Sequence, residues 1–295
     1  MALNKQIWLS TIQENFYPND SFAVHSVDDS AFVSYKTVHV PNAGAPSGVV
    51  INRTQKPASV NQRTDNELTY DIDELTTNPI HIPNVDVVEL SYDKRQSVLM
   101  NDRQQLQKAA MENLLYKWAE VGTTIKTSGD TTTAHTSTTA TGTRKKITKG
   151  DVLKIATKFN VDDVPLEGRY LLLDASMYND LLADLTDKEL SAYLASANAQ
   201  GGVLGRLYGF DIMMRSRVLR LNDSAVVKWD AEGVSTEVAA GLAWQQGCVS
   251  RALGEIKMFD STDNPLYYGD IYSFLLRTGG ALRRYDKKGV VLLSE

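Results

Sequence analysis

The fold of this chain is decided by the stretch YDKRQSVLMNDRQQLQKAAMENLLYKWAEVG, residues 92–122. Five apolar residues recur there at helical spacing on one face: Leu99, Leu106, Ala110, Leu114 and Trp118. Asp93 and Gln96 can form a start that resembles a capping box, and Gly122 is expected to end the helix. At about 1.5 Å per residue the helix would be about 40 Å long, longer than most helices in globular proteins. We therefore predict a spine along the molecule.

The composition around this helix is that of an ordinary globular protein. The 295 residues are enough for one large domain or two ordinary ones, with 42% hydrophobic and 23% charged residues. The net charge of -5 provides no overall basic surface for nucleic acid, although a local basic patch stays open. Cys248 is the single cysteine, so no intrachain disulfide forms. Because neither a signal peptide nor an apolar run of about 20 residues is found, we expect a soluble intracellular product.

Upstream of the helix, strand-like runs enclose a polar segment. The first run is FVSYKTVHVP at 32–41, which is rich in β-branched and aromatic residues. Apolar and polar residues alternate in LTYDID at 68–73 and in PIHIP at 79–83. Residues 42–66 are polar and contain two prolines and two glycines, so the region predicts a two-stranded ribbon with a wide tip. Such a ribbon is only marginally stable alone in water, and we expect its tip, residues 48–63, to lie on a neighbouring subunit.

The first thirty residues predict an extended arm rather than the start of a compact domain. Apolar residues are present, but polar residues and Pro18 keep interrupting the pattern. We expect Trp8, Ile12 and Phe16 to anchor this arm on a neighbouring subunit. Further candidates for subunit contacts are charged residues of the ribbon and of the C-terminal tail: Arg53, Lys56, Arg63, Asp65, Glu67, Arg283 and Arg284. The two tail arginines are expected to pair with acidic groups of neighbours. A solvated Lys56 is favoured over a covalent cross-link, since no dry pocket with a carboxylate base is evident.

A threonine-rich segment, TSGDTTTAHTSTTATGTRKK at 127–146, follows the helix. It has few charges and little apolar surface to bury. It therefore predicts a mobile surface loop, with a β-edge or a decorated stalk as the alternatives. His135 within the segment is expected to be solvated, and simple solvation is also expected for the nearby basic residues: Arg144, Lys145, Lys146 and Lys149.

Beyond residue 147, helices and strands alternate. Three helix starts carry capping residues: Thr148 with Asp151, Asp174, and Thr186 with Glu189. Buried strands are predicted at 169–173, with the sequence RYLLL, and at 210–214. Gly201 and Gly202 are expected to end the third helix. The pattern is that of a mixed α/β subdomain of about 130 residues, followed by a β-rich tail in which residues 286–289 are expected to turn a hairpin.

No constellation in the sequence predicts a catalytic, cofactor or metal site. Gly202, Gly205 and Gly209 follow a helix and precede a strand, the reverse of a phosphate-binding loop, so they indicate turns. None of the four histidines has metal-ligand spacing, although His39 and His81 could face each other across the ribbon. No serine lies in a G-x-S-x-G motif. A soluble α/β enzyme or ligand-binding protein stays open as a competing function, because a distant partner for a nucleophile is not visible in a sequence.

Several motifs resemble those of the major capsid proteins of tailed bacteriophages, which share the Hong Kong 97 fold. Their axial-domain strand and helix resemble RYLLLDASMYNDLLAD at 169–184, and their glycine-marked entry into the next strand resembles GVLGRLYGFDIMMRS at 202–216. Their closing peripheral strands are similar to NPLYYGDIYSFLLRTGGALRR at 264–284. Capsid proteins of phages that infect Bacteroidetes are similar to three further stretches: VHVPNAGAPS, DELTT and ELSYDKRQSVL. With the order of elements, the resemblance extends over nearly the whole chain.

The resemblance implies an α+β chain with the parts of a Hong Kong 97 capsid fold. These are an N-terminal arm at 1–31, an extended β-hairpin called the E-loop at 32–85, a peripheral domain at 86–122 and 254–295 with the spine helix, and an axial domain at 123–253. The threonine-rich segment would be an insertion in or before the axial domain.

The same resemblance implies a function. It implies self-assembly into the pentamers and hexamers of an icosahedral phage head that encloses double-stranded DNA, in a virion assembled in the cytoplasm of a bacterial host. The implied partners are further copies of the chain, a separate scaffolding protein, a portal and a decoration protein. DNA would be held without sequence-specific contact, and neither a membrane nor a cofactor is implied. An encapsulin-type cargo shell, which shares the fold, is the alternative.

Overall fold

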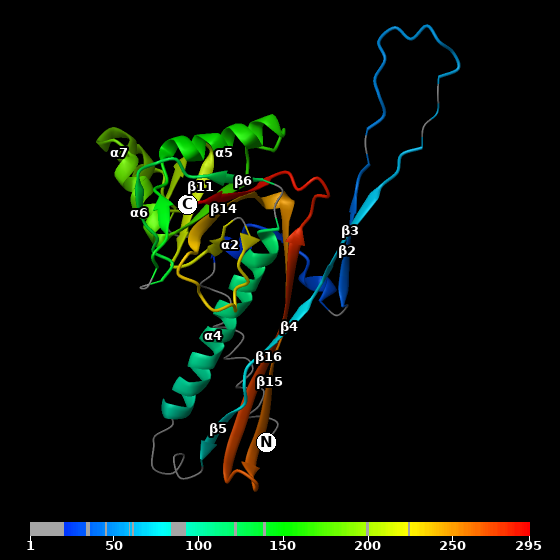
Figure 1. Ribbon diagram of the computed structural model, residues 1–295. Coiled ribbons are helices and arrows are strands. Elements are labelled where there is room, and N and C mark those ends of the chain that lie inside the picture. The colour runs from blue at the N-terminus through cyan, green and yellow to red at the C-terminus, as the bar shows by residue number, and fades with distance from the viewer. Residues whose placement is uncertain are drawn as a thin grey trace.

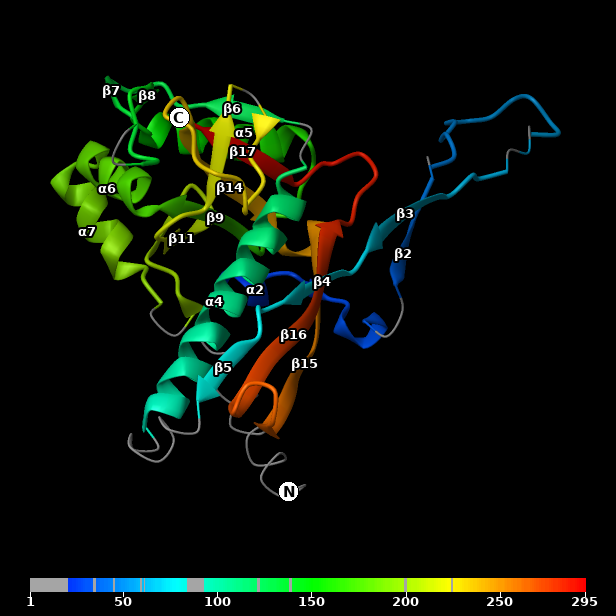
Figure 2. The ribbon, with the colours of Figure 1, turned by 60° about the horizontal axis from the view of Figure 1, so that its bottom comes forward.

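Figure 1 shows the chain as a computed structural model, with an upper body of mixed helices and strands and a lower region of long strands. The structure describes residues 21–33, 36–44, 46–58, 60, 62–83, 93–120, 123–137, 140–198, 201–223 and 225–295. Helix α4 (Asp93–Trp118) connects the two regions. The hairpin of β2 (Thr37–Asn42) and β3 (Asn66–Asp71) projects away from both (Figures 1 and 2). The predicted α+β class is confirmed.

Helix α4 forms the predicted spine. It begins at the predicted residue, and the five apolar residues of the predicted face are all buried. Leu99, Leu106 and Ala110 pack on the strands of the lower region. Leu114 and Trp118 enter the core of the upper body. One face of a single helix therefore connects two hydrophobic clusters.

The five-stranded sheet of the lower region is built around the antiparallel pair β15 (Val249–Asn264) and β16 (Gly269–Leu282). β4 (Asp73–Thr76) and β5 (Ile80–Pro83) pair with β16, and β1 (Val27–Asp28) runs parallel to β15. The short helices α2 (Ser21–Val24) and η1 (Ser30–Phe32) flank β1. A Cβ at Gly280 would collide with the Leu114 side chain, so this glycine lets α4 lie close against β16.

The two-stranded ribbon is shorter than predicted. β3 ends at Asp71, and the next two runs, β4 and β5, pair with β16 instead of β2. His39 lies opposite Thr69 in the β2–β3 hairpin, whereas His81 lies opposite Ile271. The prediction that His39 and His81 face each other was wrong, because alternation along a run does not show which strand the run pairs with.

The eight-stranded sheet of the upper body has the order β10-β11-β9-β14-β12-β13, and β17 pairs with both β14 and β6. Its strands are β6 (Thr124–Lys126), β9 (Arg169–Asp174), β10 (Gly205–Leu207), β11 (Phe210–Arg215), β12 (Leu219–Asn222), β13 (Ala225–Val226), β14 (Val238–Gln245) and β17 (Val290–Ser294). Helices α5 (Lys149–Val161), α6 (Ala175–Asp184) and α7 (Asp187–Ala195) pack on one face, over Leu171, Leu173 and Val291. The opposite face, with Leu172 and Trp244, packs against α4.

The three predicted helix starts are confirmed. Capping boxes open α5 and α7, and Asp174 Oδ1 accepts a hydrogen bond from the Met177 amide at the start of α6, at 2.8 Å. The predicted end of the third helix was wrong, since α7 stops at Ala195, before Gly201 and Gly202. The final turn of α7 is capped by backbone bonds to Ser196, so no glycine is needed there.

Gly202 and Gly209 lie outside the strands, as predicted, whereas Gly205 begins β10 and pairs with Ile212, so the prediction of a turn was wrong for Gly205. Tyr208 and Gly209 have φ values of 48° and 86° and form the two-residue turn between β10 and β11. Positive φ at both positions is the geometry of a type I′ hairpin turn. Gly202 also has a positive φ, of 69°.

The last strand, β17, departs from the predicted tail hairpin. It pairs antiparallel with β14 and parallel with β6, so it belongs to the eight-stranded sheet and not to the sheet of β15 and β16. Residues 283–289 therefore cross from one sheet to the other. All five residues of β17 are buried, which is typical of a strand inside a sheet rather than of one arm of an exposed hairpin.

The threonine-rich segment contains a β-hairpin. β7 (Thr131–Thr133) and β8 (Thr143–Lys145) pair antiparallel, which the favoured prediction of a mobile surface loop did not include. Arg144 is buried, with ion pairs to Asp180 and Glu295, and Lys149 pairs with Glu189 at 2.8 Å. Solvation was therefore the wrong prediction for Arg144, because its carboxylate partners come from parts of the chain distant in sequence.

Candidate assembly surfaces

The β2–β3 hairpin is anchored at its base and free along its outer part. Val38, Val40, Tyr70 and Ile72 are buried at the base, in a cluster that includes Ala252 of β15. Beyond the paired residues Asn42 and Asn66 the chain continues as a long excursion with no further strand in the residues that the structure describes. Figures 1 and 2 both show this excursion standing clear of the two sheets.

The end of this excursion carries exposed apolar side chains, and we call residues 46–61 the hairpin tip. Val49, Ile51 and Val60 are 93%, 85% and 96% exposed. Exposed apolar side chains that gather on a projecting element are typical of a surface that another molecule covers. Arg53 and Lys56 are also exposed on the tip, and the sequence has no acidic residue from 43 to 64. The tip is therefore both apolar and basic.

The other predicted contact residues of the ribbon have partners within the hairpin. Arg63 pairs with Asp65 at 2.6 Å, and Asp65 also accepts the Gly44 amide at 2.8 Å. Glu67 pairs with the His39 imidazole at 2.7 Å. These bonds tie the two sides of the excursion together next to the strands. A contact of Arg63, Asp65 or Glu67 with a neighbouring subunit stays a prediction.

The tail arginines also have partners within their own chain. Arg283 Nη1 lies 2.8 Å from Asp29 Oδ1, and Arg284 pairs with Asp286 at 2.7 Å. The Tyr70 hydroxyl donates to Asp29 as well, so Arg283 links the tail to the base of the hairpin. Because both arginines are already paired within the chain, their charge is no longer a reason to expect contacts with carboxylates of a neighbouring subunit. The predicted anchors Trp8, Ile12 and Phe16 lie outside the described residues.

The turn between β15 and β16 is a second exposed apolar surface, which sequence reasoning missed. Leu266, Tyr267 and Tyr268 are exposed there, at the end of the molecule opposite the hairpin tip (Figure 1). Asn264 holds the turn, because its carbonyl accepts the Tyr267 and Tyr268 amides and its side chain accepts the Leu266 amide. The sequence could have predicted this surface, because three consecutive large side chains stand there beside turn residues.

A cavity of about 580 Å³ lies between α4, β12 and the residues after β7. His135 lines it, with Nε2 2.6 Å from Asp174 Oδ2 and Nδ1 3.5 Å from Glu295 Oε2. The predicted solvation of His135 was therefore wrong. The hydrogen bond to Asp174 raises the pKa of His135. Both ring nitrogens face carboxylates, so neither is directed at a serine hydroxyl as a general base would be.

Two kinds of feature are absent from the described part of the chain, namely clusters of potential metal ligands and long apolar helices. No group of three or more His, Cys, Asp or Glu side chains there could hold a metal ion. The helices described include none that is long and apolar enough to cross a bilayer. The features that stand out are two exposed apolar surfaces at opposite ends of an elongated molecule.

No protein-family model matches the chain, and no curated protein matches it in sequence. Solved structures do match. The capsid of the cyanophage P-SCSP1u has a TM-score of 0.65 and 19% identity, over 92% of this chain and 86% of that one. The acid-stable capsid of Helicobacter pylori bacteriophage KHP30 has a TM-score of 0.61 and 13% identity, over 89% and 85%. The chain has the fold of tailed-phage capsid proteins.

A capsid-type fold also occurs in a further similar structure. The virus-like particle from Pyrococcus furiosus has a TM-score of 0.57 and 10% identity, over 98% of this chain and 99% of that one. The predicted Hong Kong 97-type class agrees with these matches. None of them bears on the predicted likeness to phages that infect Bacteroidetes, which stays a prediction. The three most exposed large apolar side chains among the described residues, Val60, Val49 and Ile51, all lie on the hairpin tip.

Proposed function

We propose that this chain is a major capsid protein, which assembles with copies of itself into the pentamers and hexamers of an icosahedral phage head. The hairpin tip carries the proposal. Its apolar side chains lie far from the cores of their own chain, so a second copy would cover them at a favourable free energy. A structural role also agrees with His135, whose two ring nitrogens both face carboxylates, and we propose no catalytic activity.

Electron microscopy of the purified chain tests the proposal. We expect closed particles of megadalton mass. A product that stays a monomer or dimer over a wide concentration range would contradict the proposal and favour a soluble ligand-binding protein. We further propose that the shell forms in the cytoplasm of a bacterial host on a separate scaffolding protein, carries a portal, and accepts a decoration protein.

The proposed head encloses double-stranded DNA without specific contact, which gives a prediction for the unassembled chain. There are 31 basic and 36 acidic residues, and Arg144, Arg283 and Arg284 are already paired with carboxylates. We expect duplex DNA to bind with a Kd weaker than about 1 μM at physiological salt. A gel-shift titration measures it, with a scrambled duplex as the control. Tight binding that depends on the DNA sequence would contradict the proposal.

A cargo shell of the encapsulin type is the second candidate. The similarity to the virus-like particle from Pyrococcus furiosus favours it, because that match spans nearly all of both chains. The contents of purified particles separate the two candidates. Particles from the native host that hold DNA support the phage head, whereas a co-purifying enzyme and no DNA would support the cargo shell.

A further inference from the structure

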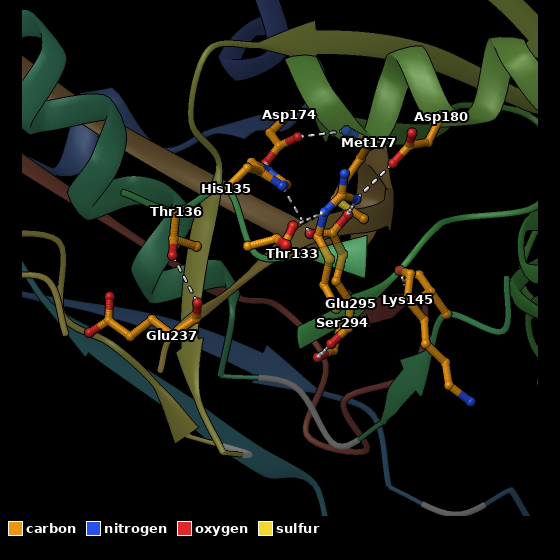
Figure 3. A network of polar contacts seen from close by, with 12 residues as sticks. Thr133, His135, Thr136, Lys145, Asp174, Met177, Asp180, Glu237, Ser294 and Glu295 are labelled. Atoms are coloured by element: carbon orange, nitrogen blue, oxygen red, sulfur yellow. Dashed lines mark hydrogen bonds and ion pairs between the residues drawn. The ribbon is translucent and has the colours of Figure 1, made fainter. Parts of the chain in front are cut away.

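Five charged side chains meet where the β7–β8 hairpin lies on the eight-stranded sheet (Figure 3). They form the charge cluster: His135, Arg144, Asp174, Asp180 and Glu295. His135 lies between Asp174 and Glu295, and Arg144 Nη1 lies between Asp180 Oδ2 at 2.7 Å and Glu295 Oε1 at 2.5 Å. The cluster therefore joins three separate parts of the chain, namely the hairpin, helix α6 and the end of β17.

The charges in the cluster do not balance when every group is ionised. Two cations then face three carboxylates, and the Glu295 side chain is 0% exposed. Among the described residues, His135 Nδ1 and Glu295 Oε2 are buried without a hydrogen-bond partner, since 3.5 Å is long for such a bond. A buried charge without full compensation is costly, so the cluster favours holding one further proton.

The surrounding groups do not supply the missing positive charge. Glu237 is paired with Arg220, and only its backbone carbonyl contacts the hairpin, through the Thr136 hydroxyl. Across the cavity, α4 presents Lys108, Glu112 and Tyr116, and the β11–β12 loop presents Arg217. Lys145, on β8 beside Arg144, is exposed to solvent. The ion pairs of His135, Arg144 and Glu295 are therefore all made within the cluster.

Polar contacts hold most of the hairpin against the sheet. Ala134 is buried, but threonine supplies most of the remaining side chains. Thr136 donates to the Glu237 carbonyl at 2.8 Å, and the Thr141 amide donates to the Ser235 carbonyl at 3.1 Å. With so little apolar area, the free energy of docking depends strongly on the charge cluster.

We propose that the charge cluster is a proton-dependent latch, which holds the threonine-rich hairpin against the eight-stranded sheet and releases it when the cluster loses its proton. Release would uncover the N-terminus of α6 and one wall of the cavity. The inference concerns contacts within one chain, so it does not depend on the proposed function.

The sign of the pH dependence follows from both titrating groups. Burial raises the pKa of Glu295 to about 7, and the bond from Asp174 raises the pKa of His135. A group whose folded pKa is raised stabilises the docked state below its unfolded pKa, and that stabilisation is lost as the pH rises through the folded pKa. Docking should therefore weaken as the pH rises from about 4.5 to about 7, the interval between the ordinary pKa of Glu295 and its raised value. The raised pKa of His135 acts in the same direction.

Hydrogen exchange on the full chain tests the latch, with rates corrected for intrinsic exchange at each pH. We expect protection of peptides from 127–146 to fall by up to about tenfold per pH unit between about pH 5 and about pH 7, where Glu295 holds its proton only in the docked state, while peptides from α5 stay constant. Glu295→Gln keeps an acceptor for Arg144 and balances the charges. In this variant the same peptides should lose less than about threefold between about pH 5 and about pH 6.5.

His39→Gln is the matched control, because it removes an exposed His–Glu pair elsewhere and should leave the wild-type profile of 127–146 unchanged. Constant protection of that segment in the wild type from about pH 4.5 to about pH 7.5 would overturn the proposal. So would an equal loss in wild type and Glu295→Gln. If Glu295→Gln does not fold, the proposal is judged on the wild-type pH profile of residues 127–146, with His39→Gln as the control.

Discussion

Replacing the hairpin tip, residues 46–61, by a short turn is expected to leave a folded subunit that forms no closed shells. The contacts that fix the hairpin to its own chain, at Val38, Val40, Tyr70 and Ile72, all lie outside the deleted stretch. The free energy of unfolding should therefore change by less than about 1 kcal/mol. Shell yield should fall by more than about tenfold, since the exposed apolar residues of the tip would be gone.

Particle counts by electron microscopy and a urea unfolding curve measure the two quantities on the same preparation. Variants that keep the length of the loop separate the effect of its side chains from the effect of its length. Val49→Ser with Ile51→Ser keeps the loop and removes apolar area, and it should also lower shell yield. Arg53→Ala with Lys56→Ala keeps the apolar area and tests the basic side chains alone. Normal shells from the tip deletion would rule out the assembly role of the tip.

The largest expected loss of stability comes from Trp118→Ala. The indole is fully buried, its Nε1 donates to the Ser250 carbonyl at 2.8 Å, and its ring centroid lies 5.6 Å from that of Trp244. Truncation leaves a cavity at the contact of α4 with both sheets. We expect the free energy of unfolding to fall by about 4 kcal/mol, because the cavity and the lost donor add.

Two further variants serve as comparisons for Trp118→Ala. Trp118→Phe keeps most of the packing and removes the donor, and it should cost about 1–2 kcal/mol. Tyr268→Ala truncates an exposed aromatic residue in the β15–β16 turn and should change the free energy of unfolding by less than about 0.5 kcal/mol. Urea unfolding measures all three. A loss below about 1 kcal/mol for Trp118→Ala would show that this contact does not couple the two regions.

Local signals in the sequence were reliable, and long-range pairing was not. The apolar face of α4 and the capping residues of α5, α6 and α7 depend on neighbours within one or two helical turns, and all were predicted. The partner of β5 and the sheet of β17 depend on strands far away in the chain, and both differed. Alternation shows that a run has a buried face, but the partner strand is chosen by the tertiary fold.

The candidate surfaces show the same division. The exposed tip was predicted because a long polar excursion is visible as a stretch of sequence. The surroundings of His135 and Arg144 were not, because Asp174, Asp180 and Glu295 come from other parts of the chain. The threonine-rich composition of residues 127–146 favoured a solvated loop. Composition alone does not show that two charged residues of this segment contact buried carboxylates.

The β15–β16 pair has a mechanical consequence. β16 runs for 14 residues, about 45 Å, from the exposed turn to Leu282 in the core around Trp118, with no break in the strand. The pairing with β15 shifts register twice, between Leu253 and Ile256 and between Ser261 and Asn264, which bends and twists the ribbon at two points. A force on Leu266, Tyr267 or Tyr268 is thus carried along an unbroken strand to the core around Trp118. The ribbon would transmit such a load to the core as a stiff element with two bends.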